Sequence, residues 1–202
     1  MSSQPAETPT LLTIGHSDHE MPAFIDLLKL HKVEVVADVR SQPYSKFHAQ
    51  FNRETLTEAL KQHGVQYLFL GKELGARRSE PEAYVGRQAR YDRVCKLPLF
   101  LSGLERLRSG VAKFRVALLC AEKDPIECHR SILICRQLRN DAFEIRHIQP
   151  DGGLESTAEL EQRLLALAAL PEAHLFMSRA QLVEEAYEVQ SGKIAFTEAE
   201  VA

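Results

Sequence analysis

The sequence lacks the features that mark membrane-bound and exported proteins. No apolar run approaches the roughly 18 residues of a membrane-spanning helix. Residues 1–10 contain no basic segment followed by an apolar one, which is the pattern of a secretory signal. The net charge of −3 gives no overall attraction to nucleic acid or to an anionic membrane. We therefore expect a cytoplasmic protein with no membrane partner.

Cysteine is scarce as well, with four residues in a chain of 202. Without an export signal these thiols are expected to stay reduced, so they serve core packing, catalysis or metal binding rather than disulfides. The chain also has no internal repeat and no low-complexity tract. Its hydrophobic content of 45% and charged content of 26% are typical of a folded, water-soluble protein.

Apolar runs typical of strands alternate with helical patterns along the chain. Strands are expected at residues 11–14, 33–39, 65–70, 116–120 and 144–148. Helices are expected to begin near Met21, after Asn52, and at Pro98, Pro125, Ser156 and Ser178. This alternation predicts an α/β fold, a Rossmann-like three-layer domain around a mainly parallel sheet.

The chain divides into three parts by composition. We expect a disordered tail at residues 1–10, the α/β domain at 11–153 and a helical C-terminal extension at 154–202. The extension begins after a turn rich in proline and glycine, and its two capped helices are leucine-rich and acidic. These helices are a candidate homodimer surface.

The most informative stretch joins the strand at 116–120 to the next helix. Asp124 followed by Pro125 is the pattern of an N-cap and first helical residue, so a helix is predicted to start at Pro125. Cys128, His129 and Arg130 would then occupy its first two turns, where free amides and the helix dipole favour anions and thiolates.

Polar residues follow the strands where a ligand site is expected. Parallel α/β sheets bind ligands beyond the carboxyl ends of their strands. The residues placed there are His16 and Ser17 after the first strand, Asp38 and Arg40 at the second, Tyr44 in the following loop, and Cys120 and Glu122 at the fourth. We therefore predict one site at this edge.

Several ordered motifs resemble those of a known family. They are residues 13–17 (TIGHS), 38–40 (DVR), 67–71 (YLFLG), 119–122 (LCAE), 128–130 (CHR) and 147–148 (HI). Over residues 11–153 the chain resembles domain-of-unknown-function family 488. The resemblance implies an α/β domain of bacterial type and no established activity. It also implies signature positions for His16, Asp38, Arg40, Cys120, Glu122, Cys128, His129 and Arg130.

The residue types at this edge suit acid–base and nucleophilic chemistry on an anion. Cys128 beside His129 is the candidate nucleophile, with His129 as proton carrier. Arg40 and Arg130 are the candidate clamp for a phosphate or carboxylate. The other candidates are Glu122 and Asp38 as general bases, His16 as a proton shuttle, and Ser17, Cys120 and Tyr44 at the substrate.

These residues also have structural interpretations. Cys128 can pack as a small hydrophobic residue, because free cysteine is usually buried. Asp38 and Glu122 can neutralise the arginines in an internal ion-pair network. The residue types alone leave both interpretations open.

Zinc is a further possibility, because thiolate and imidazole groups suit it. The possible ligands are Cys120, Cys128, His129 and His16. Adjacent residues on a helix diverge by about 100°, however, which makes it awkward for Cys128 and His129 to bind one ion. We therefore assign no metal ligand and require no cofactor.

Three classes of function stay open. The favoured one is an enzyme that hydrolyses, or transfers a group from, a phosphorylated or nucleotide-like small molecule. The second is a nucleic-acid or nucleotide binding module without turnover, which would use the basic segment 72–96. Its stacking residues would be Tyr44, Phe47, Tyr84 and Tyr91. The third is a thiol-based redox or sulfur-transfer domain that uses Cys120 and Cys128.

Overall fold

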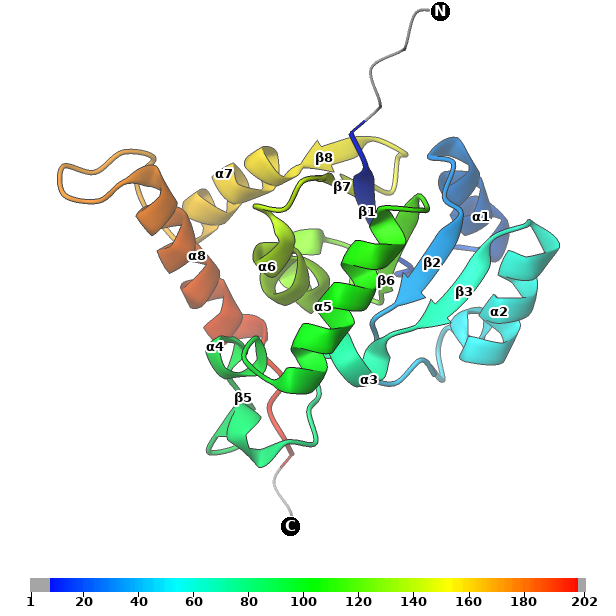
Figure 1. Cartoon of the computed structure of the whole chain (residues 1–202), viewed down its shortest axis with the longest axis horizontal. Coiled ribbons are helices and arrows are strands. Elements are labelled where there is room, and N and C mark those ends of the chain that lie inside the picture. Colours follow the sequence, from blue (N-terminus) through cyan, green and yellow to red (C-terminus); the bar gives the residue numbers. More distant parts are fainter. Residues whose placement is uncertain (1–7, 200–202) are drawn as a thin grey trace, which may run out of the picture.

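A six-stranded sheet forms the centre of the protein (Figure 1). The computed structural model describes residues 8–199. The strand order is β3-β2-β6-β1-β7-β8, and all neighbours pair in parallel except β7 and β8. The strands are β1 (Thr10–Gly15), β2 (Val35–Asp38), β3 (Gln66–Phe69), β6 (Val116–Cys120), β7 (Glu144–Ile148) and β8 (Leu154–Ser156). The predicted mainly parallel sheet is confirmed.

Helices and short turns connect these strands. The helices are α1 (Met21–Leu30), α2 (Arg53–Gln62), α3 (Gly71–Leu74), α4 (Tyr91–Val94), α5 (Pro98–Val111), α6 (Arg136–Leu138), α7 (Thr157–Leu167) and α8 (Arg179–Ile194). Single 3₁₀ turns occur at η1 (Ala49–Phe51), η2 (Pro81–Ala83) and η3 (Pro125–Glu127), and η4 (Arg130–Cys135) is a wider, π-helical segment. A two-stranded hairpin is formed by β4 (Tyr84–Val85) and β5 (Gln88–Ala89).

Apolar side chains cover both faces of the sheet. On one face, Phe24 of α1 and Leu56 of α2 pack with alternate residues of the strands. On the other, Phe100 of α5 and Ile132 of η4 belong to a larger cluster that also contains residues of α7 and α8. Figure 1 shows α1 and α2 on one side and α5 on the other. The predicted three-layer architecture is therefore confirmed.

The carboxyl ends of the central strands lie at one edge of the sheet. β6 is buried along its whole length and pairs with both β1 and β2. Gly15 at the end of β1 is opposite Cys120, and Asp38 at the end of β2 is opposite Leu119. A Cβ at Gly15 would lie 1.9 Å from the Glu122 carbonyl oxygen, so the loop after β6 approaches β1 this closely only because residue 15 is glycine.

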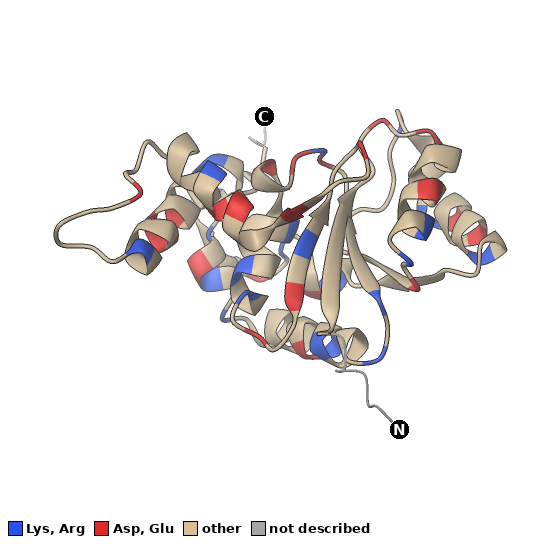
Figure 2. Cartoon of the chain, turned by 90° about the horizontal axis from the view of Figure 1, so that it is seen from above, with Lys and Arg blue, Asp and Glu red and all other residues tan. Residues whose placement is uncertain are grey.

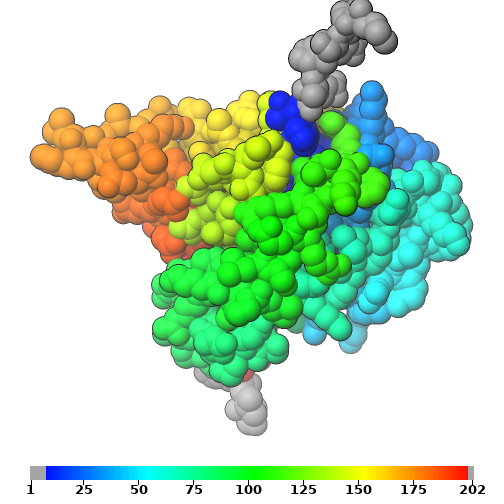
Figure 3. All heavy atoms as spheres, in the orientation of Figure 1, coloured from blue at the N-terminus to red at the C-terminus, as the bar shows by residue number. Residues whose placement is uncertain are grey.

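The C-terminal helices are packed on the α/β core. Ser156 and Ser178 form capping boxes at the start of α7 and α8. Leu164 and Leu182 lie in the same apolar cluster as the strands. The connection between α7 and α8 protrudes from the molecule (Figure 3). The chain division at residue 153 and the homodimer stay predictions, and residues 1–7 of the predicted tail lie outside the described residues.

Basic and acidic residues are interspersed along the helices (Figure 2). Within residues 8–199, no helix has both the length and the apolar character needed to cross a membrane.

Candidate functional site

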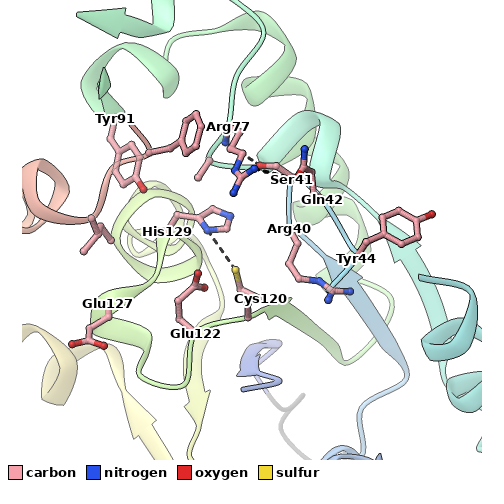
Figure 4. A pocket seen from close by; sticks show the side chains of 14 residues that line it. Arg40, Ser41, Gln42, Tyr44, Arg77, Tyr91, Cys120, Glu122, Glu127 and His129 are labelled. Carbon is pink, nitrogen blue, oxygen red and sulfur yellow. Dashed lines mark hydrogen bonds between the residues drawn. The ribbon is translucent and has the colours of Figure 1, made fainter. Parts of the chain in front are cut away.

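A cavity of about 300 Å³ lies beyond the carboxyl ends of β2 and β6 (Figure 4). Its wall is formed by the loop after β2, the segment after α3, α4, the end of β6, the turn before η4, and the end of α8 with the segment that follows it. The lining residues are Arg40, Ser41, Gln42, Tyr44, Ala76, Arg77, Tyr91, Cys120, Ala121, Glu122, Glu127, His129, Ile194 and Phe196. This is the position at which parallel α/β sheets bind ligands.

The chain around Cys128 does not form the single helix that we expected from Pro125. Asp124 caps only one 3₁₀ turn, by accepting a hydrogen bond from the Ile126 amide at 3.0 Å. Cys128 then has extended backbone angles (φ −127°, ψ 138°), and η4 begins at Arg130. The prediction was wrong because buried contacts of the Cys128 and His129 side chains override the local helical preference.

This break in the helix brings four reactive side chains together. The sulfur, nitrogen and oxygen atoms of Cys120, Glu122, Cys128 and His129 all lie within 4.8 Å of one another. Cys120 Sγ is 3.5 Å from His129 Nδ1, and Cys128 Sγ is 3.9 Å from the same nitrogen. Cys128 Sγ and Glu122 Oε2 share a hydrogen bond at 2.9 Å. We call these four residues the thiol cluster.

His129 is held in one orientation by the backbone of β2. Its Nε2 lies 3.1 Å from the Val39 carbonyl oxygen, which can only accept a hydrogen bond. Nε2 therefore carries the proton, and Nδ1 faces the two thiols. Figure 4 shows its contact with Cys120. The sequence predicted that Cys128 and His129 would diverge on a helix. They do not, because Cys128 has an extended backbone and precedes η4.

Arg130 lies behind the thiol cluster rather than in the cavity. Its side chain is fully buried and donates to the carbonyl oxygens of Glu122 (2.7 Å) and Lys123 (3.1 Å). Its backbone amide donates to Cys128 Sγ at 3.4 Å. Arg130 therefore fixes the loop after β6, and the structure does not bring it to the cavity wall beside Arg40.

Burial and neighbouring charges set the acidity of the cluster. Burial raises the pKa of the Cys120 thiol well above its ordinary value, and a hydrogen bond to Cys128 adds to the effect. Burial also opposes ionisation of Cys128, but the hydrogen bond from Cys120 and the charge of Arg130 lower the Cys128 pKa well below its ordinary value. Glu122 is exposed as a residue, but the protein around its carboxyl group removes part of its hydration, and this desolvation together with the adjacent Cys128 raises the pKa of Glu122. The surroundings therefore act on the two thiols in opposite directions: they disfavour the thiolate of Cys120 and favour that of Cys128.

Asp38 and Arg40 form a buried ion pair at the end of β2. Arg40 donates from Nε and Nη2 to the two carboxylate oxygens of Asp38 at 2.9 and 2.5 Å. Tyr67 donates to Asp38 Oδ2 at 2.9 Å, and Arg40 Nη2 also donates to the Phe51 carbonyl oxygen at 3.0 Å. Asp38 is fully buried and does not line the cavity, whereas Arg40 does. The base role predicted for Asp38 has no contact with the cavity to support it.

His16, Ser17 and Tyr44 lie at an adjoining hollow of about 570 Å³, which shares Arg40 and Glu122 with the cavity. His16 stacks on Phe51, with ring centroids 4.5 Å apart, and burial together with Arg40 lowers its pKa to about 4. His16 is therefore neutral near pH 7. Ser17 donates to Asp18 at 3.0 Å, and Tyr44 lines both spaces.

A family described as Domain of unknown function DUF488 matches residues 20–136, which is more than half of the chain. The chain belongs to this family. The match includes all four residues of the thiol cluster and leaves out His16 and Ser17. No curated protein and no solved structure matches the chain.

Several residues that line the cavity of this DUF488 protein were not among the predicted site residues; Arg77 and Phe196 are two of them, and Tyr91 was considered only as a stacking residue for nucleic acid. Arg77 lies with its guanidinium carbon 4.8 Å from the centre of the Phe196 ring, and it donates to Gln42 Oε1 at 3.0 Å. The Tyr91 hydroxyl is buried at the wall without a hydrogen-bond partner among the described residues. Arg77 and Tyr91 lie in the basic segment, which was a usable signal. Nothing in the sequence indicates that Phe196 reaches this site.

The basic segment 72–96 of the DUF488 protein is largely engaged in internal contacts. Arg78 is buried, donates to the Glu73 carbonyl oxygen at 2.8 Å and pairs with Glu80 at 2.6 Å. Arg90 pairs with Asp92 at 3.3 Å. Tyr91, a proposed stacking residue, is 3% exposed. These contacts leave less free charge and aromatic surface for nucleic acid than the composition indicated.

Proposed function

We propose that this protein is an enzyme that binds a small anionic substrate, phosphorylated or nucleotide-like, and hydrolyses it or transfers a group from it. One observation carries the proposal. The same cavity has a cationic end, formed by Arg40 and Arg77, and a reactive end, formed by Cys120, Glu122 and His129.

The cationic end can bind a phosphate or carboxylate group. Within residues 8–199, Arg40 Nη1 has no hydrogen-bond acceptor, while the other two nitrogens hold Asp38. The Arg77 guanidinium group packs against the Phe196 ring and donates a hydrogen bond to Gln42 in the loop after β2. Planar guanidinium groups suit oxyanions because they donate two parallel hydrogen bonds. The aromatic ring of Phe196 offers an apolar wall for a base or similar group.

The reactive end can move a proton. Glu122 lines the cavity and shares a hydrogen bond with Cys128, and its raised pKa brings the carboxyl closer to neutral pH. His129 Nδ1 contacts Cys120, which is the thiol that lines the cavity. Glu122 is thus the group best placed to exchange a proton with a bound substrate.

Binding is tested first with Arg77→Gln. Isothermal titration with pyrophosphate and with mononucleotides should show about 10-fold to 100-fold weaker binding, because a hydrogen bond to a charged group contributes about 1.5–3 kcal/mol. Arg146→Gln is the matched control, since Arg146 pairs with Glu144 and does not line the cavity. Equal affinity of Arg77→Gln and the wild type would contradict an anion site at this end.

Turnover is tested with a panel of phosphate esters and nucleotides. Glu122→Gln should lower the rate by at least about 100-fold while retaining binding, because a positioned acid or base contributes about 10²–10⁴-fold. A wild type that binds these anions but converts none of them would reduce the protein to a binding module.

A redox function is the second candidate. It is favoured by a single observation, that Cys120 Sγ and Cys128 Sγ lie within 4.8 Å of each other. A reversible disulfide between these two residues, mapped by mass spectrometry, would support it.

A further inference from the structure

We propose that the thiol cluster binds one zinc ion, with Cys120, Cys128 and His129 as permanent ligands and Glu122 as an exchangeable fourth ligand. That this ion is the cofactor of an enzyme rests on the proposed function. Zinc binding itself can be measured without a substrate, so the two proposals can fail separately.

The spacing of the four ligand atoms fits a tetrahedral ion. Zinc bonds of about 2.3 Å to sulfur and about 2.0–2.1 Å to nitrogen or oxygen require about 3.5 Å between a sulfur and a nitrogen ligand. Cys120 Sγ and Cys128 Sγ are 3.5 and 3.9 Å from His129 Nδ1. Cys128 Sγ and Glu122 Oε2 are closer, at 2.9 Å, and the whole set lies within 4.8 Å. A rotation of the exposed Glu122 side chain would open this last distance.

The surroundings orient the ligands before any ion binds. Metal-binding histidines usually donate their second ring N–H to a carbonyl or carboxylate, and His129 Nε2 makes this contact with the Val39 carbonyl oxygen at 3.1 Å. The Arg130 backbone amide donates to Cys128 Sγ at 3.4 Å and so holds this sulfur in place. The Arg130 guanidinium holds the backbone of Glu122 and Lys123. The cluster is therefore supported on the protein side and open on the cavity side.

The charges of the site also fit a divalent ion. On binding an ion, the two thiols and the carboxyl would lose their protons and bring three negative charges to within 4.8 Å of one another. A divalent cation and the fully buried Arg130 together neutralise them. Thiolate and imidazole ligands favour zinc over magnesium or calcium, which prefer oxygen.

The ligands differ in exposure to solvent, and this difference distinguishes the three permanent ligands from the exchangeable one. Cys120, Cys128 and His129 are at most 7% exposed, whereas Glu122 is exposed and lines the cavity. Catalytic zinc sites typically have three protein ligands and one position for water or substrate. An anion bound at Arg40 would lie in the same cavity as this fourth position.

The test is metal analysis of the reduced, full-length protein. After chelation and titration with zinc, we expect one ion per chain, and cobalt in its place should give thiolate-to-metal charge-transfer absorption. Cys120→Ser should weaken zinc binding by more than the roughly 10-fold to 100-fold loss seen when an outer partner is removed. Cys95→Ser is the matched control, because Cys95 lies outside the cluster and should keep the full stoichiometry.

A second measurement covers the case in which Cys120→Ser does not fold. Zinc should protect Cys120 and Cys128 of the wild type from alkylation, and leave Cys95 unprotected, as mapped by mass spectrometry. Absence of zinc uptake by the reduced wild type overturns the proposal, as does uptake without thiolate absorption. Zinc binding without any affinity for pyrophosphate or nucleotides would keep the metal site and remove the proposed function.

Discussion

Two groups of polar residues lie at the carboxyl ends of the neighbouring strands β2 and β6. They differ in how completely their hydrogen-bond donors are matched by acceptors. At the end of β2, Asp38, Arg40 and Tyr67 match donors to acceptors: each oxygen of Asp38 receives a hydrogen bond. At the end of β6, two thiols and a carboxyl lie within 4.8 Å of one another around His129 Nδ1, and the buried Arg130 guanidinium donates to backbone carbonyl oxygens rather than to these groups. The first group stabilises the fold. The second is a group of like ligands that a cation or a substrate would complete.

The largest expected difference is in the free energy of unfolding, when the carboxylate of each group is replaced by the matching amide. Asp38→Asn leaves Arg40 buried without its counter-charge, which should cost about 3–5 kcal/mol of unfolding free energy. Glu122→Gln removes a charge at an exposed position and should change the metal-free protein by less than about 1 kcal/mol. Urea denaturation in the presence of a chelator measures both. Similar losses in the two variants would contradict the distinction.

A third buried group, Thr13 and His147, extends the comparison to pH. Burial, Arg130 and Arg163 lower the pKa of His147 from 6.5 to about 3, and its Nδ1 lies 2.8 Å from Thr13 Oγ1. The folded protein therefore holds this imidazole neutral, while the unfolded chain takes up a proton below pH 6.5. Stability should fall as the pH falls from 6.5 towards 3, by about 2 kcal/mol at pH 5 from this residue.

The variant His147→Asn tests this pH dependence. The measured quantity is the slope of unfolding free energy against pH between 7 and 5 rather than the stability at one pH, because the substitution also changes packing. The slope should decrease in His147→Asn and stay unchanged in His63→Asn, where the histidine is exposed. An unchanged slope in His147→Asn would show that the protein does not exclude the proton at this site.

The smallest expected change in unfolding free energy is at Tyr67, whose hydroxyl donates to the Asp38 carboxylate of the Asp38–Arg40 ion pair. Tyr67→Phe removes the hydrogen bond to Asp38 Oδ2 but leaves both contacts from Arg40, so it should cost about 1 kcal/mol. Tyr44→Phe removes a comparable contact with Glu54 at an exposed position and should cost less. Equal losses would show that burial of the Asp38 pair contributes nothing to the strength of this contact.

The sequence allowed most of the sheet to be predicted but only part of the site. The runs at 116–120 and 144–148 match β6 and β7 residue for residue. The first is a continuous apolar run that is buried along its whole length, and the second buries Ile145 and Ile148 among polar residues. Parallel α/β sheets bind ligands beyond the carboxyl ends of their strands, and this rule predicted that Cys120 and Glu122 would lie in one site with residues 128–130.

The rest of the site depends on contacts between distant segments. The cap at Asp124 is correct, yet the length of the turn is decided by the burial of Cys128 and by the contact of His129 with Val39. The antiparallel β8 and the approach of Phe196 to Arg77 depend on how the C-terminal extension packs on the core. Local sequence patterns contain none of this information.

The most direct test of the account is the effect of zinc on unfolding free energy in three proteins. With zinc at 100 times its dissociation constant, the wild type and Asp38→Asn should both gain about 2.7 kcal/mol, because the ion binds the folded thiol cluster and not the Asp38 pair. Cys120→Ser should gain far less. No gain in the wild type, or an equal gain in Cys120→Ser, would contradict the assignment of the β6 end as a ligand site.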